Sequence, residues 1–169
     1  MKAVKKAKKK RNPFKVGGVK IKNAKKKTVD GINFKSSLEA FCYTQLKQNG
    51  FKDFQYEGHK FILQDKFDFP LLSWELQSKK TNGKIIKSFG PDSMKIRAIT
   101  YTPDFVSIND NKEGWIIETK GFETTDFKIK WKMFKKLLAD YGFKVDLYVP
   151  NTQENVMNTI KKKKKRREL

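Results

Sequence analysis

The chain has 169 residues and a formal net charge of +21, a length that suits one domain with extensions. No apolar run approaches the 18 or more residues of a membrane span, and no apolar segment follows the basic N-terminus, so we expect neither a membrane helix nor a secretory signal. The single cysteine, Cys42, excludes an internal disulfide and a cysteine-rich zinc site, and it is compatible with a cytoplasmic protein.

Charge is concentrated at the two ends of the chain. Residues 1–27 carry 13 Lys and Arg and no acid, and residues 161–169 carry seven Lys and Arg with a single Glu. We therefore expect a nearly neutral globular domain over residues 28–160, between a disordered basic arm and a disordered basic tail. Lysine-rich segments attract phosphate without regard to sequence, which favours nucleic acid as the partner. A nuclear-import signal and an anionic membrane surface are the alternatives.

The first elements predicted in the domain are an extended segment and a helix. Residues 28–34 form the extended segment, with a turn at Asp30-Gly31. Apolar residues at helical spacing follow, from an N-cap at Ser36 to a stop at Gly50. Ser36 and Glu39 have the spacing of a capping box, in which the Glu reaches back to a free backbone N–H. Glu39 therefore has a structural role open to it as well as a functional one.

A strand and an insert are predicted next. Residues 54–63 have the composition of a strand, and His59, the only histidine, lies in its middle. One histidine excludes a multi-histidine metal site and points to a structural role. Residues 64–94 combine apolar content with turn signals at Asn82-Gly83 and Gly90-Pro91, a combination that indicates an inserted hairpin.

A second predicted hairpin carries the chemistry. Its strands cover residues 100–108 and 114–120, and if it folds symmetrically about its turn, Asp104 lies opposite Glu118. Opposed side chains lie about 4.5–5.5 Å apart, where like charges repel. Two carboxylates that close imply a shared proton or a bound cation, and Lys120 shares their face. The pattern indicates a metal-dependent phosphodiester site. An ordinary solvated strand face is the alternative.

A helix and a strand complete the predicted domain. The helix covers residues 125–141 and ends at Gly142, and the strand covers residues 143–149. Five apolar side chains at helical spacing are expected to face the core: Phe127, Trp131, Phe134, Leu138 and Tyr141. The lysines between them form either a solvated face or a surface for phosphate.

The order of these elements, with the acidic residues at these places, resembles the PD-(D/E)XK nuclease superfamily, which includes restriction endonucleases and Holliday-junction resolvases. The segment Gly31-Ile32-Asn33-Phe34-Lys35-Ser36-Ser37-Leu38-Glu39 matches the helix start G-x-x-F-x-S-x-x-E of a compact phage-encoded branch. Tyr101-Thr102-Pro103-Asp104-Phe105 and Glu118-Thr119-Lys120-Gly121 match the Y-x-x-D-F and E-x-K-G segments of that branch. The resemblance covers residues 28–150 and implies an α/β fold with an αβββαβ core, in which helices flank a mixed central sheet.

The resemblance also implies the roles of individual residues. Asp104 and Glu118 would bind Mg²⁺ with the backbone carbonyl of Thr119, and Mn²⁺ is expected to substitute. Glu39 would complete the acidic cluster, directly or through water. Lys120 would position or help to activate the attacking water and offset charge on the phosphate.

Three lysines of the second predicted helix are candidate nucleic-acid contacts by the same resemblance: Lys128, Lys130 and Lys132. The expected activity is a Mg²⁺-dependent endodeoxyribonuclease, selective for branched DNA such as Holliday junctions, acting in recombination or repair. A phage origin and the cytoplasm of the host cell follow from the resemblance, and a homodimer is an expectation by analogy. The rivals are a non-enzymatic nucleic-acid-binding protein, such as a compaction or assembly factor, and a catalytically inactive member of the fold.

Overall fold

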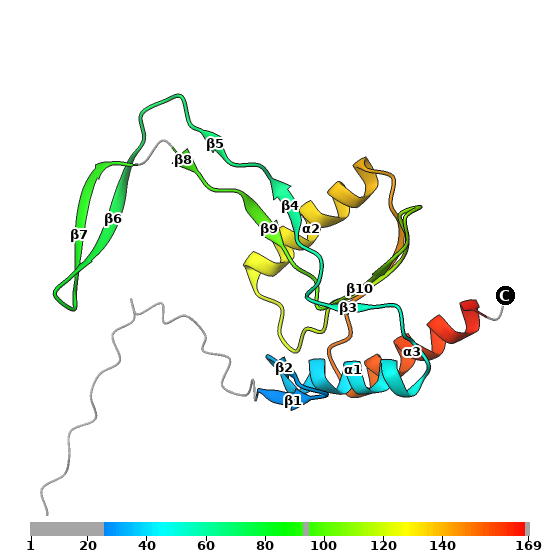
Figure 1. Ribbon diagram of the computed structural model, residues 1–169. Coiled ribbons are helices and arrows are strands. Elements are labelled where there is room, and N and C mark those ends of the chain that lie inside the picture. The colour runs from blue at the N-terminus through cyan, green and yellow to red at the C-terminus, as the bar shows by residue number, and fades with distance from the viewer. Residues whose placement is uncertain (1–25, 93–94, 168–169) are drawn as a thin grey trace, which may run out of the picture.

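The computed structural model describes residues 26–92 and 95–167, so the basic arm expected over residues 1–27 lies almost entirely outside the described residues. Figure 1 shows the arrangement of the elements. In chain order they are β1 (Lys27–Val29), β2 (Ile32–Phe34), α1 (Ser37–Gln48), β3 (Gln55–Tyr56), β4 (Phe61–Gln64), β5 (Phe67–Asp68), β6 (Trp74–Thr81), β7 (Lys84–Pro91), β8 (Lys95–Ile96), β9 (Ile99–Tyr101), β10 (Phe105–Ile108), β11 (Glu113–Ile117), α2 (Thr125–Asp140), β12 (Lys144–Tyr148) and α3 (Gln153–Arg167).

A four-stranded mixed sheet organises the domain. Its strand order is β12–β11–β10–β3, with β11 antiparallel to β10 and parallel to β12. The short strand β3 pairs antiparallel with β10 at the edge. The elements α1, β3, β10, β11, α2 and β12 follow the predicted αβββαβ order, which confirms the α/β class.

Helices cover both faces of the sheet because side chains alternate along its strands. Phe105, Trp115 and Ile117 face one side, where they join a hydrophobic cluster with α1 and α3. Val106 and Ile116 face the other side and pack against α2. In Figure 1, α1 and α3 accordingly lie together on one side of the sheet and α2 on the other.

The elements predicted for the start of the domain are confirmed. Asp30 and Gly31 turn the chain between β1 and β2 with φ values of 50° and 77°. The Ser36 hydroxyl caps α1 by accepting the Glu39 N–H at 3.2 Å. The chain leaves α1 through Gly50, whose φ of 79° favours glycine.

Two predicted strands are each divided by a corner in the chain. Residues 54–63 form β3 and β4 rather than one strand, with Glu57 at φ 49° between them. Residues 100–108 likewise divide between β9 and β10 at Pro103, which cannot donate a hydrogen bond to a sheet. The physical reason is a change of partner: β3 and β10 stay in the central sheet, whereas β4 and β9 pair with each other.

The segment between β4 and β9 forms a long excursion from the core. The pairs β4–β9, β5–β8 and β6–β7 follow one another outward, and the last pair is the hairpin expected within residues 64–94. Asn82 and Gly83 form its tight turn with φ values of 49° and 77°, as an Asn-Gly turn favours. The turn expected at Gly90-Pro91 is absent, because both residues continue the β7 ladder opposite Glu75 and Trp74.

The basic tail expected over residues 161–169 is helical through Arg167, so the prediction of disorder is wrong there. Lys163 explains part of the difference, because its side chain is buried against the rest of the domain. Its Nζ lies 3.4 Å from Asp146 Oδ2 and 5.8 Å from the centre of the Trp115 ring. A second expectation also fails: Tyr141, assigned to the core, caps the C-terminus of α2 and is 65% exposed.

Within residues 26–92 and 95–167, none of the helices is long and apolar enough to cross a membrane.

Candidate functional site

The central hairpin brings two carboxylates together at the end of its ladder. Phe105 pairs with Ile117 and Val106 with Ile116, which is the register that symmetry about the turn predicts. Asp104 and Glu118 come directly beyond the last pair. The Asp104 N–H donates to Glu118 Oε2 at 3.3 Å, and both side chains are buried.

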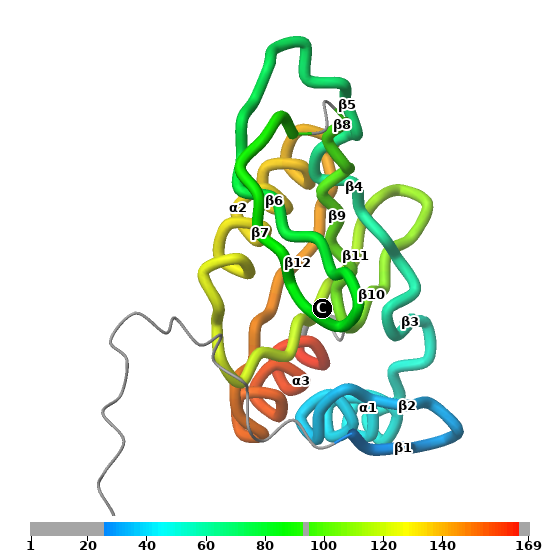
Figure 2. The backbone as a smooth tube through the Cα atoms, turned by 90° about the vertical axis from the view of Figure 1, so that its left-hand side faces the viewer, coloured from blue at the N-terminus to red at the C-terminus, as the bar shows by residue number. Residues whose placement is uncertain are grey.

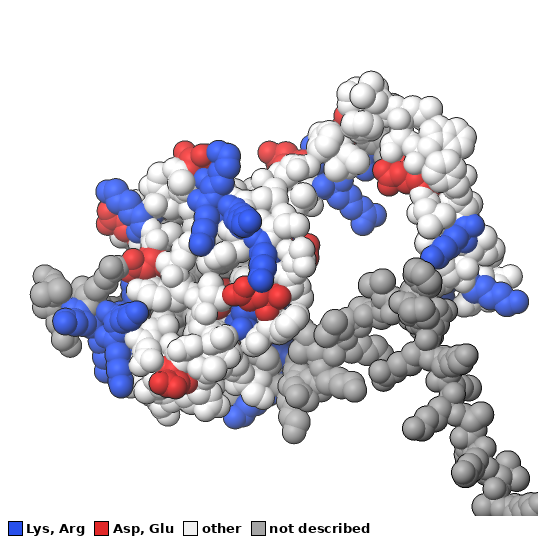
Figure 3. Space-filling model, turned by 180° about the vertical axis from the view of Figure 1, so that it is seen from behind, with Lys and Arg blue, Asp and Glu red and all other residues white. Residues whose placement is uncertain are grey.

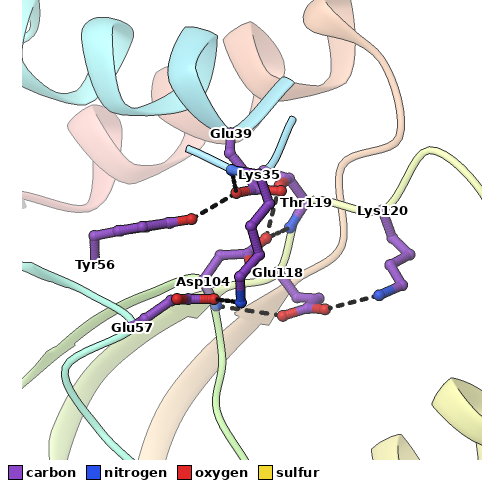
Figure 4. A network of polar contacts seen from close by, with 8 residues as sticks. All are labelled: Lys35, Glu39, Tyr56, Glu57, Asp104, Glu118, Thr119 and Lys120. Carbon is purple, nitrogen blue, oxygen red and sulfur yellow. Dashed lines mark hydrogen bonds and ion pairs between the residues drawn. The ribbon is translucent and has the colours of Figure 1, made fainter. Parts of the chain in front are cut away.

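Thr119 holds the Asp104 carboxylate in place. Its backbone N–H and its hydroxyl both donate to Asp104 Oδ2, at 2.8 and 2.7 Å. Figure 4 shows this network, in which the carboxylates from the two strands meet beneath the start of α1. Because Thr119 occupies one oxygen of Asp104 with two donors, the orientation of the carboxylate is fixed before any ligand binds.

Burial raises the pKa of both carboxyls, and the charge of Glu118 adds to the shift at Asp104. For Asp104, burial is the larger cause and the charge of Glu118 the next, while the hydroxyl of Thr119 opposes them. Burial also raises the pKa of Glu118, and Lys120 opposes that shift. A pair of carboxyls with raised pKa values in a pocket is typical of a site that binds a proton or a cation.

Lys120 supplies one positive charge beside the pair. Its Nζ lies 3.4 Å from Glu118 Oε1 and 4.8 Å from the centre of the Phe127 ring on α2. The aromatic face favours a cation at this distance and so holds the ammonium at the edge of the site. One lysine offsets only one of two carboxylate charges.

Glu39 has a structural role in the observed geometry. Its Oε2 accepts the Lys35 N–H at 2.9 Å and the Tyr56 hydroxyl at 2.6 Å. The capping box therefore exists in a modified form, because the Glu reaches the N–H of the residue before the N-cap. Glu39 is also buried, and Figure 4 shows it directed from α1 toward Asp104 and Thr119.

These residues line one pocket of about 310 Å³. Of the three lysines predicted to contact nucleic acid, Lys130 lines this pocket, whereas Lys128 and Lys132 do not. Lys128 lies near Glu123 on the protein surface, with 3.8 Å between the charged atoms. A larger hollow of about 520 Å³ lies between the end of β12 and α3, but no carboxylate lines it.

Four further residues lie at the site that were not predicted from the sequence. Lys35 and Glu57 form an ion pair in the pocket wall, and Glu57 raises the pKa of Lys35 through their hydrogen bond. Tyr56 binds Glu39, as described above. The Tyr101 hydroxyl is buried near the Glu118 carboxylate, and burial followed by the Glu118 charge raises the pKa of the hydroxyl. Of these four, only Tyr101 occupies a defined position of a sequence motif, as the first residue of the Y-x-x-D-F segment.

The donor atoms at the site fit a hard divalent cation. Asp104 and Glu118 offer carboxylate oxygens, and Mg²⁺ typically takes one or two carboxylates and keeps several waters. Among the described residues, no group of three or more His, Cys, Asp or Glu is placed to hold a metal ion.

The fold and the site define a mixed α/β protein with a buried carboxylate pair and a lysine at one end of its sheet. The chain belongs to a family described as "Protein of unknown function (DUF1064)", whose model matches residues 20–147. The matched range includes every residue of the carboxylate site. No curated protein and no solved structure matches the chain.

Proposed function

We propose that the protein is a Mg²⁺-dependent endodeoxyribonuclease of the PD-(D/E)XK type, with Mn²⁺ able to replace Mg²⁺. The observation that carries the proposal is the buried pair of Asp104 and Glu118 with Lys120 beside it. Buried like charges cost folding free energy, and a role in binding a cation gives a reason for keeping them.

Each group at the site has a chemical role that suits phosphodiester hydrolysis. Asp104 and Glu118, with the carbonyl of Thr119, would hold the ion. Bound Mg²⁺ supplies an activated water and offsets negative charge on the phosphate. Lys120, fixed over the Phe127 ring, orients the water or stabilises the charge that grows in the transition state.

Two lysines in the pocket wall suit the phosphates next to the scissile bond. Lys130 projects from the second turn of α2, and Lys35 lies just before the N-cap of α1. Each is paired with a carboxylate, Asp126 or Glu57, and could exchange that partner for a phosphate oxygen. This arrangement supports DNA as the substrate, with branched DNA in recombination or repair as the proposed target and the host cytoplasm as the place of action.

A cleavage assay tests the proposal. Wild-type protein is incubated with plasmid and with a four-way junction, with Mg²⁺ or with EDTA, beside Asp104→Ala and Lys120→Ala. We expect wild type to cut only with metal and each variant to lose at least about a hundredfold in rate while still binding DNA. Lys144→Ala is the matched control, because this exposed lysine pairs with Glu113 at the opposite end of the sheet. Equal cutting by Asp104→Ala and wild type would refute the site.

A non-enzymatic nucleic-acid-binding protein is the second candidate, favoured by the net charge of +21. It predicts binding by wild type and all variants with no cutting under any metal condition. Pure binding gives no reason to bury Asp104 and Glu118 side by side, which is why the nuclease is preferred.

A further inference from the structure

The β6–β7 hairpin exposes apolar side chains far from both hydrophobic clusters. Cross-strand partners share a face of a two-stranded ribbon, and the register pairs Leu76 with Phe89 and Lys80 with Ile85. One face therefore carries both apolar and basic side chains: Trp74, Leu76, Lys80, Ile85, Lys87 and Phe89. Its four apolar members are 54–69% exposed. Exposed apolar patches of this kind mark interaction sites.

Charge identifies the kind of partner. The outer half of the ribbon, residues 78–88, carries four lysines and no acid. None of these lysines forms an ion pair with another described residue. Two copies of the ribbon would bring eight positive charges together, which disfavours self-pairing. A polyanion complements this charge, and the bases or sugars of nucleic acid complement the apolar side chains.

The ribbon also lies where such a partner would reach the carboxylate site. In Figure 1 it hangs on the side of the molecule where α1 and α2 begin, and in Figure 2, seen from that side, it lies in front of β9, β10 and β11. Figure 3 shows it as an arm that stands apart from the body, with open space between them. Both helix starts contribute to the wall of the site, so the arm and the site face the same space.

We propose that the β6–β7 ribbon is a second DNA contact, which holds the duplex against the carboxylate site from the opposite side. The inference rests on the proposed function, since it assigns DNA as the occupant of the space. A two-stranded ribbon fits the major groove of B-DNA, where lysines reach phosphates and apolar side chains reach base edges. A ribbon alone is marginally stable in water, and bound DNA stabilises it.

Binding measurements test the proposal without any need for cleavage. The affinity of the full chain for a short fluorescent duplex and for a four-way junction is measured by anisotropy, with Ca²⁺ in place of Mg²⁺, over a range of salt concentrations. Lys80→Gln/Lys87→Gln removes two charges from the ribbon. Lys52→Gln/Lys144→Gln removes two exposed charges at the other end of the sheet and is the matched control.

We expect the ribbon variant to reduce the slope of log affinity against log salt by about 1.8 and to weaken binding at least tenfold at about 0.1 M salt. The control should change the slope by much less. Melting temperatures should stay equal, because the ribbon lies outside both hydrophobic clusters.

A ribbon variant with the slope of the control would overturn the proposal. In that case sedimentation of Leu76→Ser/Phe89→Ser identifies the occupant, because a loss of dimer mass would assign the face to a second copy of the chain. The outcome is independent of the nuclease proposal. If wild type binds with a slope that depends on the ribbon but never cuts, the nuclease proposal is refuted and the ribbon contact stands. If wild type cuts but the ribbon variant keeps the slope of the control, the ribbon contact is refuted and the nuclease proposal stands.

Discussion

The carboxyl group of Asp104 is buried, and the carboxylate of Glu118 lies next to it. Its pKa in the folded protein lies above the unfolded value of about 3.9, so the folded state binds the proton more tightly. The stability that comes from this proton is complete below the unfolded pKa and is lost as the pH rises through the raised pKa. Without metal, ionisation of the pair therefore destabilises the fold as the pH rises through the raised pKa of about 7.

Asp104→Asn should remove that cost while keeping an oxygen for Thr119. In EDTA, we expect the melting temperature of the variant minus that of wild type to rise between about pH 4 and pH 8. The expected difference is a few degrees, since 1 kcal/mol shifts melting by about 2–4 °C in a chain of this size. Mg²⁺ should raise the melting temperature of wild type and leave the variant unchanged. A difference that does not depend on pH would contradict the raised pKa.

Two substitutions separate the structural role of Glu39 from its proposed role at the carboxylate site. Glu39→Gln keeps an oxygen that can accept from Lys35 and Tyr56, whereas Glu39→Ala removes it. We expect only Glu39→Ala to lose stability, by about 1 kcal/mol, as the loss of a helix cap does. Both should slow Mg²⁺-dependent cutting at least about tenfold if the carboxylate charge serves the site. Glu39→Gln that cuts like wild type would leave Glu39 with the structural role alone.

Among the helices and strands, the features that depend on interactions between residues close in sequence were predicted from the sequence. The N-cap at Ser36, the helix over Thr125–Asp140 and the register that opposes Asp104 and Glu118 follow from spacing and turn chemistry. The corner at Glu57 was not predictable in this way, because it depends on β3 and β4 pairing with different strands. Glu57 reaches the pocket and its ion pair with Lys35 through that corner, so no sequence pattern marked it.

The end of α3 also depends on contacts between residues far apart in the sequence. Its lysine run looks like a solvated tail, yet Lys163 lies against Trp115, Tyr148 and Asp146. We expect Lys163→Ala to cost about 1–2 kcal/mol, measured by urea unfolding, because it removes a packed aliphatic stem as well as a charge. Lys163→Met, which keeps the stem, should cost less, and the exposed Lys164→Ala should stay within about 0.5 kcal/mol. Equal effects at both positions would mean that the burial of Lys163 contributes nothing.

For the whole molecule, the net charge lies mainly at the two ends of the chain, apart from the carboxylate site. The ends hold 19 of the 21 net charges, while residues 28–160 are nearly balanced and contain the carboxylate site. The position of the β6–β7 ribbon, which stands apart from the body of the domain, was not predictable, because three successive strand pairs set its direction and no local pattern encodes their combined path.

The path of that excursion has a consequence for how the chain can vary. The excursion leaves the core at Gln64 and returns at Ile99, and these two residues are partners in the β4–β9 ladder. A turn of a few residues could join them without moving any side chain of the two hydrophobic clusters. We therefore expect that the segment between them can be lengthened, shortened or exchanged as a unit while the core that supports the site keeps its packing.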